Sequence, residues 1–72
     1  MFRDLIVRQH NAADRFLAFV EEHTGCTRAE ALRVLAYYRK NRLVKLGVHD
    51  GQFRVSHGVL LEPDVLRRAI NA

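Results

Sequence analysis

The side chains best suited to chemistry in this sequence are one cysteine, four histidines and a cluster of arginines and lysines. The histidines are scattered, and with a single cysteine they form none of the spacings that bind zinc. The sequence also contains no phosphate-binding glycine loop, no Cys-x-x-Cys pair and no His-Glu-x-x-His motif. We therefore expect neither a metal site nor a cofactor.

Cys26 is the one thiol that could act as a nucleophile if a histidine activated it. A chain of 72 residues, however, has little room for a substrate pocket in addition to a core. Cys26 directly follows Gly25, where a small apolar side chain would pack into a turn between two helices. We interpret Cys26 as a buried structural thiol and predict that the protein is not an enzyme.

The basic residues are concentrated in one segment, residues 28–45, where only Glu30 is acidic. The formal net charge of the whole chain is +4, and outside this segment acidic residues slightly outnumber basic ones. A localised positive patch favours a polyanionic partner, although solvated helix faces can also be rich in lysine and arginine. The basic residues of the segment are Arg28, Arg33, Arg39, Lys40, Arg42 and Lys45.

The pattern from Thr27 to about Asn41 predicts a helix that presents this charge. Thr27-Arg28-Ala29-Glu30 is a complete capping box, in which Thr27 and Glu30 each accept a backbone N–H of the other. At 100° per residue, the core side of the helix contains Ala31, Val34, Leu35 and Tyr38. The opposite side contains Ala29, Arg33, Ala36, Tyr37 and Lys40, flanked by Arg28 and Arg39. Small residues beside long basic ones let a helix approach base edges, and an alanine methyl can contact thymine.

A second helix is expected before the Gly25 turn. Asn11 is a good N-cap, and apolar residues recur at helical spacing from there to His23, which lies at the edge of the apolar face and is expected to be partly buried. Residues 1–10 fit either a helix or, at 5–7, a strand, and we favour a separate short helix because a three-helix core needs one.

A hairpin and a last helix are expected after residue 43. Two alternating stretches flank Asp50-Gly51, which predicts a two-residue type I′ turn with Val48 opposite Phe53 and Leu46 opposite Val55. The outward side chains would be those of Lys45, His49 and Arg54. Pro63 at a first helical position starts the last helix, whose apolar face contains Val65, Leu66, Ala69 and Ile70.

Composition favours one folded domain over residues 1–72, since 49% of the residues are hydrophobic. No apolar run approaches the roughly 20 residues of a membrane span, and the N-terminal residues lack the features of a signal peptide. A single cysteine fits a reducing compartment. We expect a cytoplasmic protein without a membrane partner.

Residues 18–35 resemble the winged helix-turn-helix domain of bacterial and phage DNA-binding proteins. The matching positions are Val20 before the turn, Gly25 in it, Cys26, the N-cap Thr27, and the apolar Ala31 and Val34. Arg42-Leu43-Val44 is similar to the Gly-Leu-Val with which many such domains leave the second helix. The resemblance implies an α+β fold with a helical core, one β-hairpin wing and a C-terminal helix. Glu21 departs from the pattern, because the family usually has a small residue there.

The resemblance also implies a function, which is sequence-specific binding of double-stranded DNA by a small transcriptional regulator. Arg28, Ala29, Arg33 and Tyr37 would face the bases or the groove floor, and Lys40, Lys45, His49 and Arg54 would contact the backbone. Winged-helix domains can instead bind proteins, here an acidic partner, and an architectural, excisionase-like DNA binder is a third reading. One domain recognises only a half-site, so a homodimer is expected, with Val65, Leu66 and Ile70 at its interface unless they complete the core.

Overall fold

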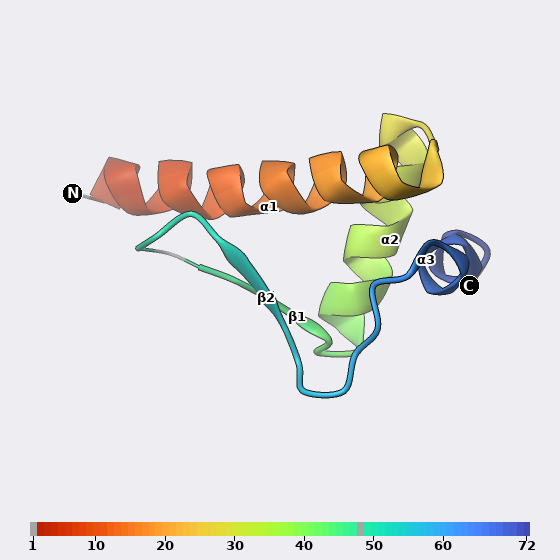
Figure 1. Ribbon diagram of the computed structural model, residues 1–72. Helices are drawn as coiled ribbons and strands as arrows, with labels where there is room; N and C mark the ends of the chain where they lie inside the picture. Colours follow the sequence, from red (N-terminus) through yellow and green to blue (C-terminus); the bar gives the residue numbers. More distant parts are fainter. Residues whose placement is uncertain (1, 48) are drawn as a thin grey trace.

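The computed structural model describes residues 2–47 and 49–72, with the side chains described from residue 11 onward. Three helices and one antiparallel hairpin make up the fold (Figure 1). This is the small α+β arrangement expected from the sequence, with a helical core, a hairpin and a C-terminal helix. The elements are α1 (Phe2–Thr24), α2 (Arg28–Lys40), β1 (Val44–Leu46), β2 (Phe53–Val55) and α3 (Pro63–Ile70).

Helix α1 is one continuous helix of 23 residues, which corrects the expectation of two helices with a boundary at Asn11. Asn11 lies inside α1 with an exposed side chain, and residues 5–7 are helical, so the strand alternative is wrong as well. An exposed asparagine costs a helix only a few tenths of a kcal/mol, and extending an existing helix is cheaper than starting a new one. A good N-cap residue therefore does not force a break.

The turn between α1 and α2 follows the sequence prediction closely. Gly25 has φ +71°, a left-handed conformation that favours glycine, and its N–H donates to the Glu21 carbonyl at 2.8 Å. The capping box is formed, because Thr27 Oγ1 accepts from the Glu30 N–H at 3.2 Å and Glu30 Oε1 accepts from the Thr27 N–H at 3.0 Å. Helix α2 thus leaves the C-terminal end of α1 at a steep angle (Figure 1).

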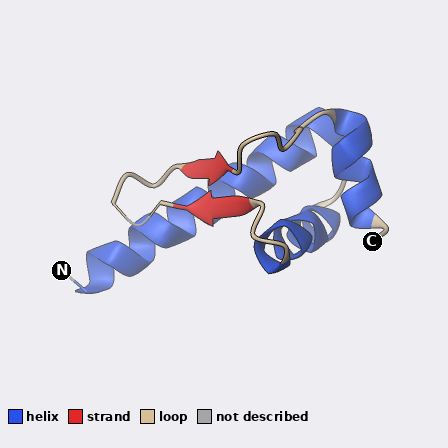
Figure 2. Ribbon diagram, turned by 90° about the horizontal axis from the view of Figure 1, so that it is seen from below, coloured by secondary structure: helices blue, strands red, loops and turns tan. Residues whose placement is uncertain are grey.

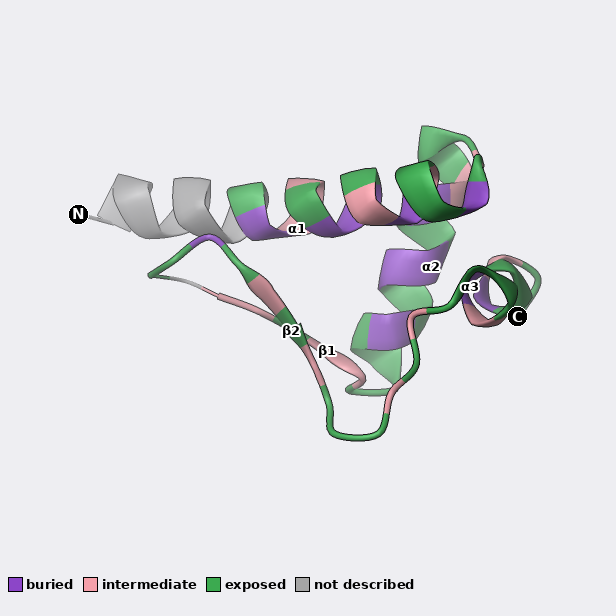
Figure 3. Ribbon diagram, viewed as in Figure 1, coloured by how far each residue is buried: buried purple, intermediate pink, exposed green. Residues whose placement is uncertain are grey.

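The core lies where the three helices and the hairpin meet. Its largest fully buried side chains are Tyr38, Phe16, Leu66, Val20 and Val34. The predicted core side of α2 is confirmed, since all four of its residues are buried (Figure 3). The apolar face of α3 also completes the core with Leu66 and Ala69, so Leu66 is unavailable for a dimer interface.

The hairpin packs along α1 and has a different register from the predicted one (Figure 2). Leu46 pairs with Phe53, not with Val55, and Val44 pairs with Val55. Asp50-Gly51 therefore sits inside a longer loop, where Asp50 Oδ1 accepts the Gln52 N–H at 3.0 Å. A shift of two residues keeps every side chain on its face, because strand side chains alternate with a period of two. The predicted partner Val48 lies outside the described residues.

Two smaller expectations about the turn region also change. Cys26 is half-buried and packs against the core, where the sequence favoured full burial. His23 is exposed and not partly buried: its ring stacks on Phe19 with centroids 3.9 Å apart, and its Nδ1 lies 2.9 Å from the Phe19 carbonyl oxygen.

Candidate nucleic-acid interface

The outer face of α2 is exposed, as the helical pattern predicts. Ala29, Arg33, Ala36 and Lys40 are all exposed along it. The structure adds Leu32, which is 50% exposed on the same helix and was not assigned to either side by the sequence analysis. The position of Leu32 between the two faces of the helical wheel was the sequence signal that could have indicated its partial exposure. The surface therefore carries Arg33 and Lys40 beside small alanines at its centre, with the apolar Leu32 along one edge.

Arg28 has a structural environment that the sequence did not predict. Its guanidinium donates to Asp14 Oδ1 at 2.9 Å and to Glu21 Oε2 at 3.1 Å, both on α1. These ion pairs fasten the first turn of α2 to α1. They also account for Glu21, whose carboxylate binds Arg28 at the position where the winged helix-turn-helix pattern usually has a small residue. The guanidinium of Arg28 thus binds two carboxylates of the same molecule. The resemblance had implied that this group would contact bases.

The C-terminal end of α2 closes with a Schellman motif centred on Arg42. The Leu43 N–H donates to the Tyr38 carbonyl at 2.7 Å, and the Arg42 N–H donates to the Arg39 carbonyl at 3.1 Å. Arg42 has φ +56°, and it is the one residue other than glycine with a positive φ among those described. This is the position where the sequence resemblance has glycine.

Beyond Arg42, the end of α2 and the hairpin border a hollow of about 550 Å³. We call it the basic hollow, and its polar lining residues are Arg39, Arg42, Lys45, Arg54 and Ser56. Lys45 and Arg54 are cross-strand partners, so their side chains leave the same face of the hairpin. Arg54 also donates to Asp50 Oδ2 at 2.6 Å. The pKa of Asp50 is lowered by the Gln52 N–H and by this bond to Arg54.

The two adjacent tyrosines point in different directions, as predicted. Tyr38 is 1% exposed and its hydroxyl donates to the Leu60 carbonyl at 3.3 Å, whereas Tyr37 is 39% exposed. Burial, with a smaller effect of Tyr37, raises the pKa of Tyr38. Tyr37 borders a second hollow together with Arg33 and Lys40 on the α3 side of the helix. It therefore lies beside the outer face and not at its centre.

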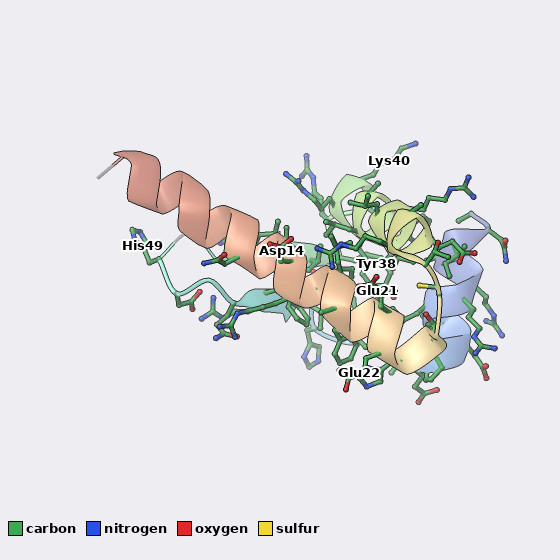
Figure 4. All side chains as sticks on the ribbon, turned by 90° about the horizontal axis from the view of Figure 1, so that it is seen from above. Asp14, Glu21, Glu22, Tyr38, Lys40 and His49 are labelled. Carbon is green, nitrogen blue, oxygen red and sulfur yellow. The ribbon has the colours of Figure 1, made fainter. Side chains whose placement is uncertain are left out.

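The eight residues expected at an interface fall into separate places. Ala29, Arg33 and Lys40 share the outer face of α2, with Tyr37 at its α3 edge, while Arg28 binds α1. Lys45 and Arg54 border the basic hollow, and His49 lies in the hairpin loop, far from Lys40 (Figure 4). Arg39 and Arg42 were not among the eight residues predicted from the sequence, although both belong to the basic segment.

Two further findings concern metal binding and membrane spanning within residues 2–47 and 49–72. There, no group of three or more histidine, cysteine or acidic residues is placed to hold a metal ion. In the same ranges, no helix combines the length and apolar character needed to cross a membrane. Comparisons of the chain with protein-family models, curated proteins and solved structures found no match.

Proposed function

We propose that this protein binds double-stranded DNA with sequence preference through the outer face of α2, as a small transcriptional regulator of the bacterial or phage winged helix-turn-helix kind. The basic residues at the C-terminal end of the helix and on the hairpin would contact the phosphate backbone. Residues in the middle of α2 would approach the bases.

The observation that carries the proposal is a set of exposed cations that have no hydrogen-bond or ion-pair partner in the part of the chain that the structure describes. Arg33, Arg39, Lys40, Arg42 and Lys45 are exposed, and none forms a hydrogen bond or ion pair through its side chain with a described residue. Five unpaired positive charges repel one another unless counterions or a polyanion are near. Binding DNA replaces those counterions with phosphates and releases the ions around the duplex, which drives association.

Sequence preference would come from the centre of the same face. Arg33 projects from α2 between the small Ala29 and Ala36. Because these alanine side chains are short, the helix can come close to the groove. Arginine forms bidentate hydrogen bonds with guanine, and Leu32 or alanine methyl groups can contact thymine. One copy of α2 spans only a half-site, so we further propose that two copies bind together.

The experiment that tests this proposal is a salt series of duplex binding by fluorescence anisotropy. Contacts to about four to six phosphates predict a log–log slope of about −0.9 per contact, with tighter binding to a duplex selected from a random pool than to a scrambled one. Absence of binding to either duplex at low salt would refute the proposal. Equal binding to both, with bending of the duplex, would favour the architectural alternative.

A protein-binding role is a second candidate, and the exposed Leu32 favours it. A half-exposed leucine on a basic helix face could pack against an apolar residue of an acidic partner. Duplex binding by the wild type and by Leu32→Ala distinguishes the roles. If the face binds DNA, the wild type binds duplex and Leu32→Ala loses its preference between duplexes differing in one T·A pair. If the face binds an acidic peptide, the wild type binds no duplex.

A further inference from the structure

Arg42 combines two features: its backbone has the left-handed conformation, and its side chain lines the basic hollow. The second feature offers a reason for the first. An L-residue in the left-handed region is less stable than glycine there, because its Cβ crowds the backbone. Residues are held in such conformations when the surrounding structure fixes them, and they are concentrated at functional sites. Glycine would be more stable at this position (φ +56°), so the presence of an arginine side chain needs an explanation.

The backbone around Arg42 is held on both sides. On the helix side, the two Schellman bonds fix Arg42 and Leu43 to the last turn of α2. On the hairpin side, Ser56 Oγ donates to the Arg42 carbonyl at 2.8 Å and the Ser56 N–H donates to the Leu43 carbonyl at 2.9 Å. These four bonds determine where the Arg42 side chain begins, and they place it between α2 and the hairpin.

The charge of the basic hollow is suited to an anion. Arg39, Arg42 and Lys45 line it without an ion pair to any described residue, and Arg54 is the one lining cation that has a carboxylate partner. No acidic side chain belongs to the lining, as far as the described residues go. Three unpaired cations around one hollow match the charge and the several acceptor oxygens of a phosphate group.

We propose that the basic hollow binds one phosphate of the duplex backbone through Arg39, Arg42 and Lys45, and that Arg42 occupies its strained position for this contact. The proposal rests on the DNA-binding function proposed above and assigns three of its exposed cations to one phosphate at one site. It also fixes the hairpin in a definite relation to the duplex, because the phosphate bridges the end of α2 and the cross-strand pair at Lys45.

The variants Arg42→Gly and Arg42→Ala test it as a matched pair. Both remove the guanidinium, but only glycine relieves the left-handed strain. We expect each to bind duplex DNA about 5- to 10-fold more weakly at 0.1 M salt, with a salt slope smaller by up to about 0.9, the value for complete loss of one phosphate contact. We expect Arg42→Gly alone to melt above the wild type, by about 4 °C. Gain of stability with loss of affinity is a combination that a purely structural arginine would not produce.

Arg68→Ala is the charge control, because Arg68 is an exposed arginine on α3 that does not line the basic hollow. It should leave the salt slope unchanged. If the wild type binds duplex and both Arg42 variants keep its affinity and slope, this inference is wrong while the proposed function stands. If the wild type binds no duplex, the proposed function itself fails.

A titration with inorganic phosphate, followed by NMR, separates the two sources of the anion. Shifts of the Arg42 and Ser56 amide signals that vanish in Arg42→Gly are expected at millimolar phosphate, with much tighter binding of the duplex. Saturation by inorganic phosphate at lower concentrations than by duplex would overturn the assignment to the DNA backbone.

Discussion

The first and last turns of α2 both carry arginine, but their surroundings give these residues different roles. At the first turn, Arg28 binds Asp14 and Glu21 of α1, so its charge is neutralised within the molecule. At the last turn, Arg39 and Lys40 are exposed and have no ion-pair partner among the described residues. A count of positive charges along a helix therefore does not locate an interface. The carboxylates of neighbouring elements decide which charges remain available.

The largest expected effect comes from removing the charges of the last turn. The double variant Arg39→Ala/Lys40→Ala should weaken duplex binding about 50-fold at 0.1 M salt, since each lost phosphate contact costs about 8-fold. Its melting temperature should change little, because only a favourable interaction with the helix dipole is lost. Fluorescence anisotropy across a salt series measures the effect. A loss below about 3-fold would show that the last turn is not the phosphate-binding end.

The hairpin that borders this end depends on a glycine. A Cβ on Gly47 would collide with Asp50 Oδ1 and would lie 2.7 Å from the Gln52 carbonyl oxygen, which is backbone and cannot swing away. We expect Gly47→Ala to lower the free energy of unfolding by about 1–3 kcal/mol, as overpacking does. Urea unfolding checks this, with Gln52→Ala as the control because it keeps the carbonyl. A variant as stable as the wild type would mean that the hairpin loop adapts without cost.

Arg28→Ala is expected to lower stability slightly and to leave duplex affinity almost unchanged, the reverse of the last-turn variant. Duplex affinity should stay within about 2-fold of the wild type, because the guanidinium is already bound to α1. The free energy of unfolding should fall by less than about 1 kcal/mol, since all three partners are partly exposed and water screens the ion pairs. A double-mutant cycle with Glu21→Gln measures the coupling. If affinity instead falls as in the last-turn variant, Arg28 contacts DNA and the contrast between the two ends is lost.

Local patterns made much of this fold predictable from the sequence. The capping box at Thr27, the core face of α2 and the start of α3 at Pro63 depend on neighbours within a turn or two of helix. Spacing alone contains that information. The continuity of α1 was missed because Asn11 is compatible both with a cap and with an exposed position inside a helix.

The parts of the candidate site that the sequence did not predict depend on distant partners. Arg28 and Asp14 are 14 residues apart, and their contact exists only once α1 and α2 cross. The hairpin register was not predicted because both registers place the same residues on the apolar face that packs against the core. The left-handed Arg42 is held by Ser56, which belongs to the other side of the hairpin. The charge pattern predicted the basic segment, but it did not predict which of its residues pair with α1 and which remain available to a partner.

The smallest effect concerns pH and again compares the two ends. Hydrogen bonds lower the pKa of two carboxylates: the Thr27 N–H and hydroxyl act on Glu30 at the first turn, and the Gln52 N–H and Arg54 act on Asp50 beside the basic hollow. A carboxylate with a lowered folded-state pKa stabilises the fold above its unfolded-state pKa. That stability is lost as the pH falls through the folded-state value.

We therefore expect the melting temperature to fall between about pH 6 and pH 3, and to fall less in Glu30→Gln and in Asp50→Asn. Glu22→Gln is the control, because the exposed Glu22 side chain forms no hydrogen bond or ion pair with a described residue. The two variants differ in a second respect. Asp50→Asn leaves Arg54 without its carboxylate and adds a fourth unpaired cation to the basic hollow, so it should tighten duplex binding at neutral pH. Glu30→Gln should not alter the slope of the salt series, since no phosphate contact is expected at the first turn. A steeper slope in Glu30→Gln than in Asp50→Asn would reverse the assignment of the two ends.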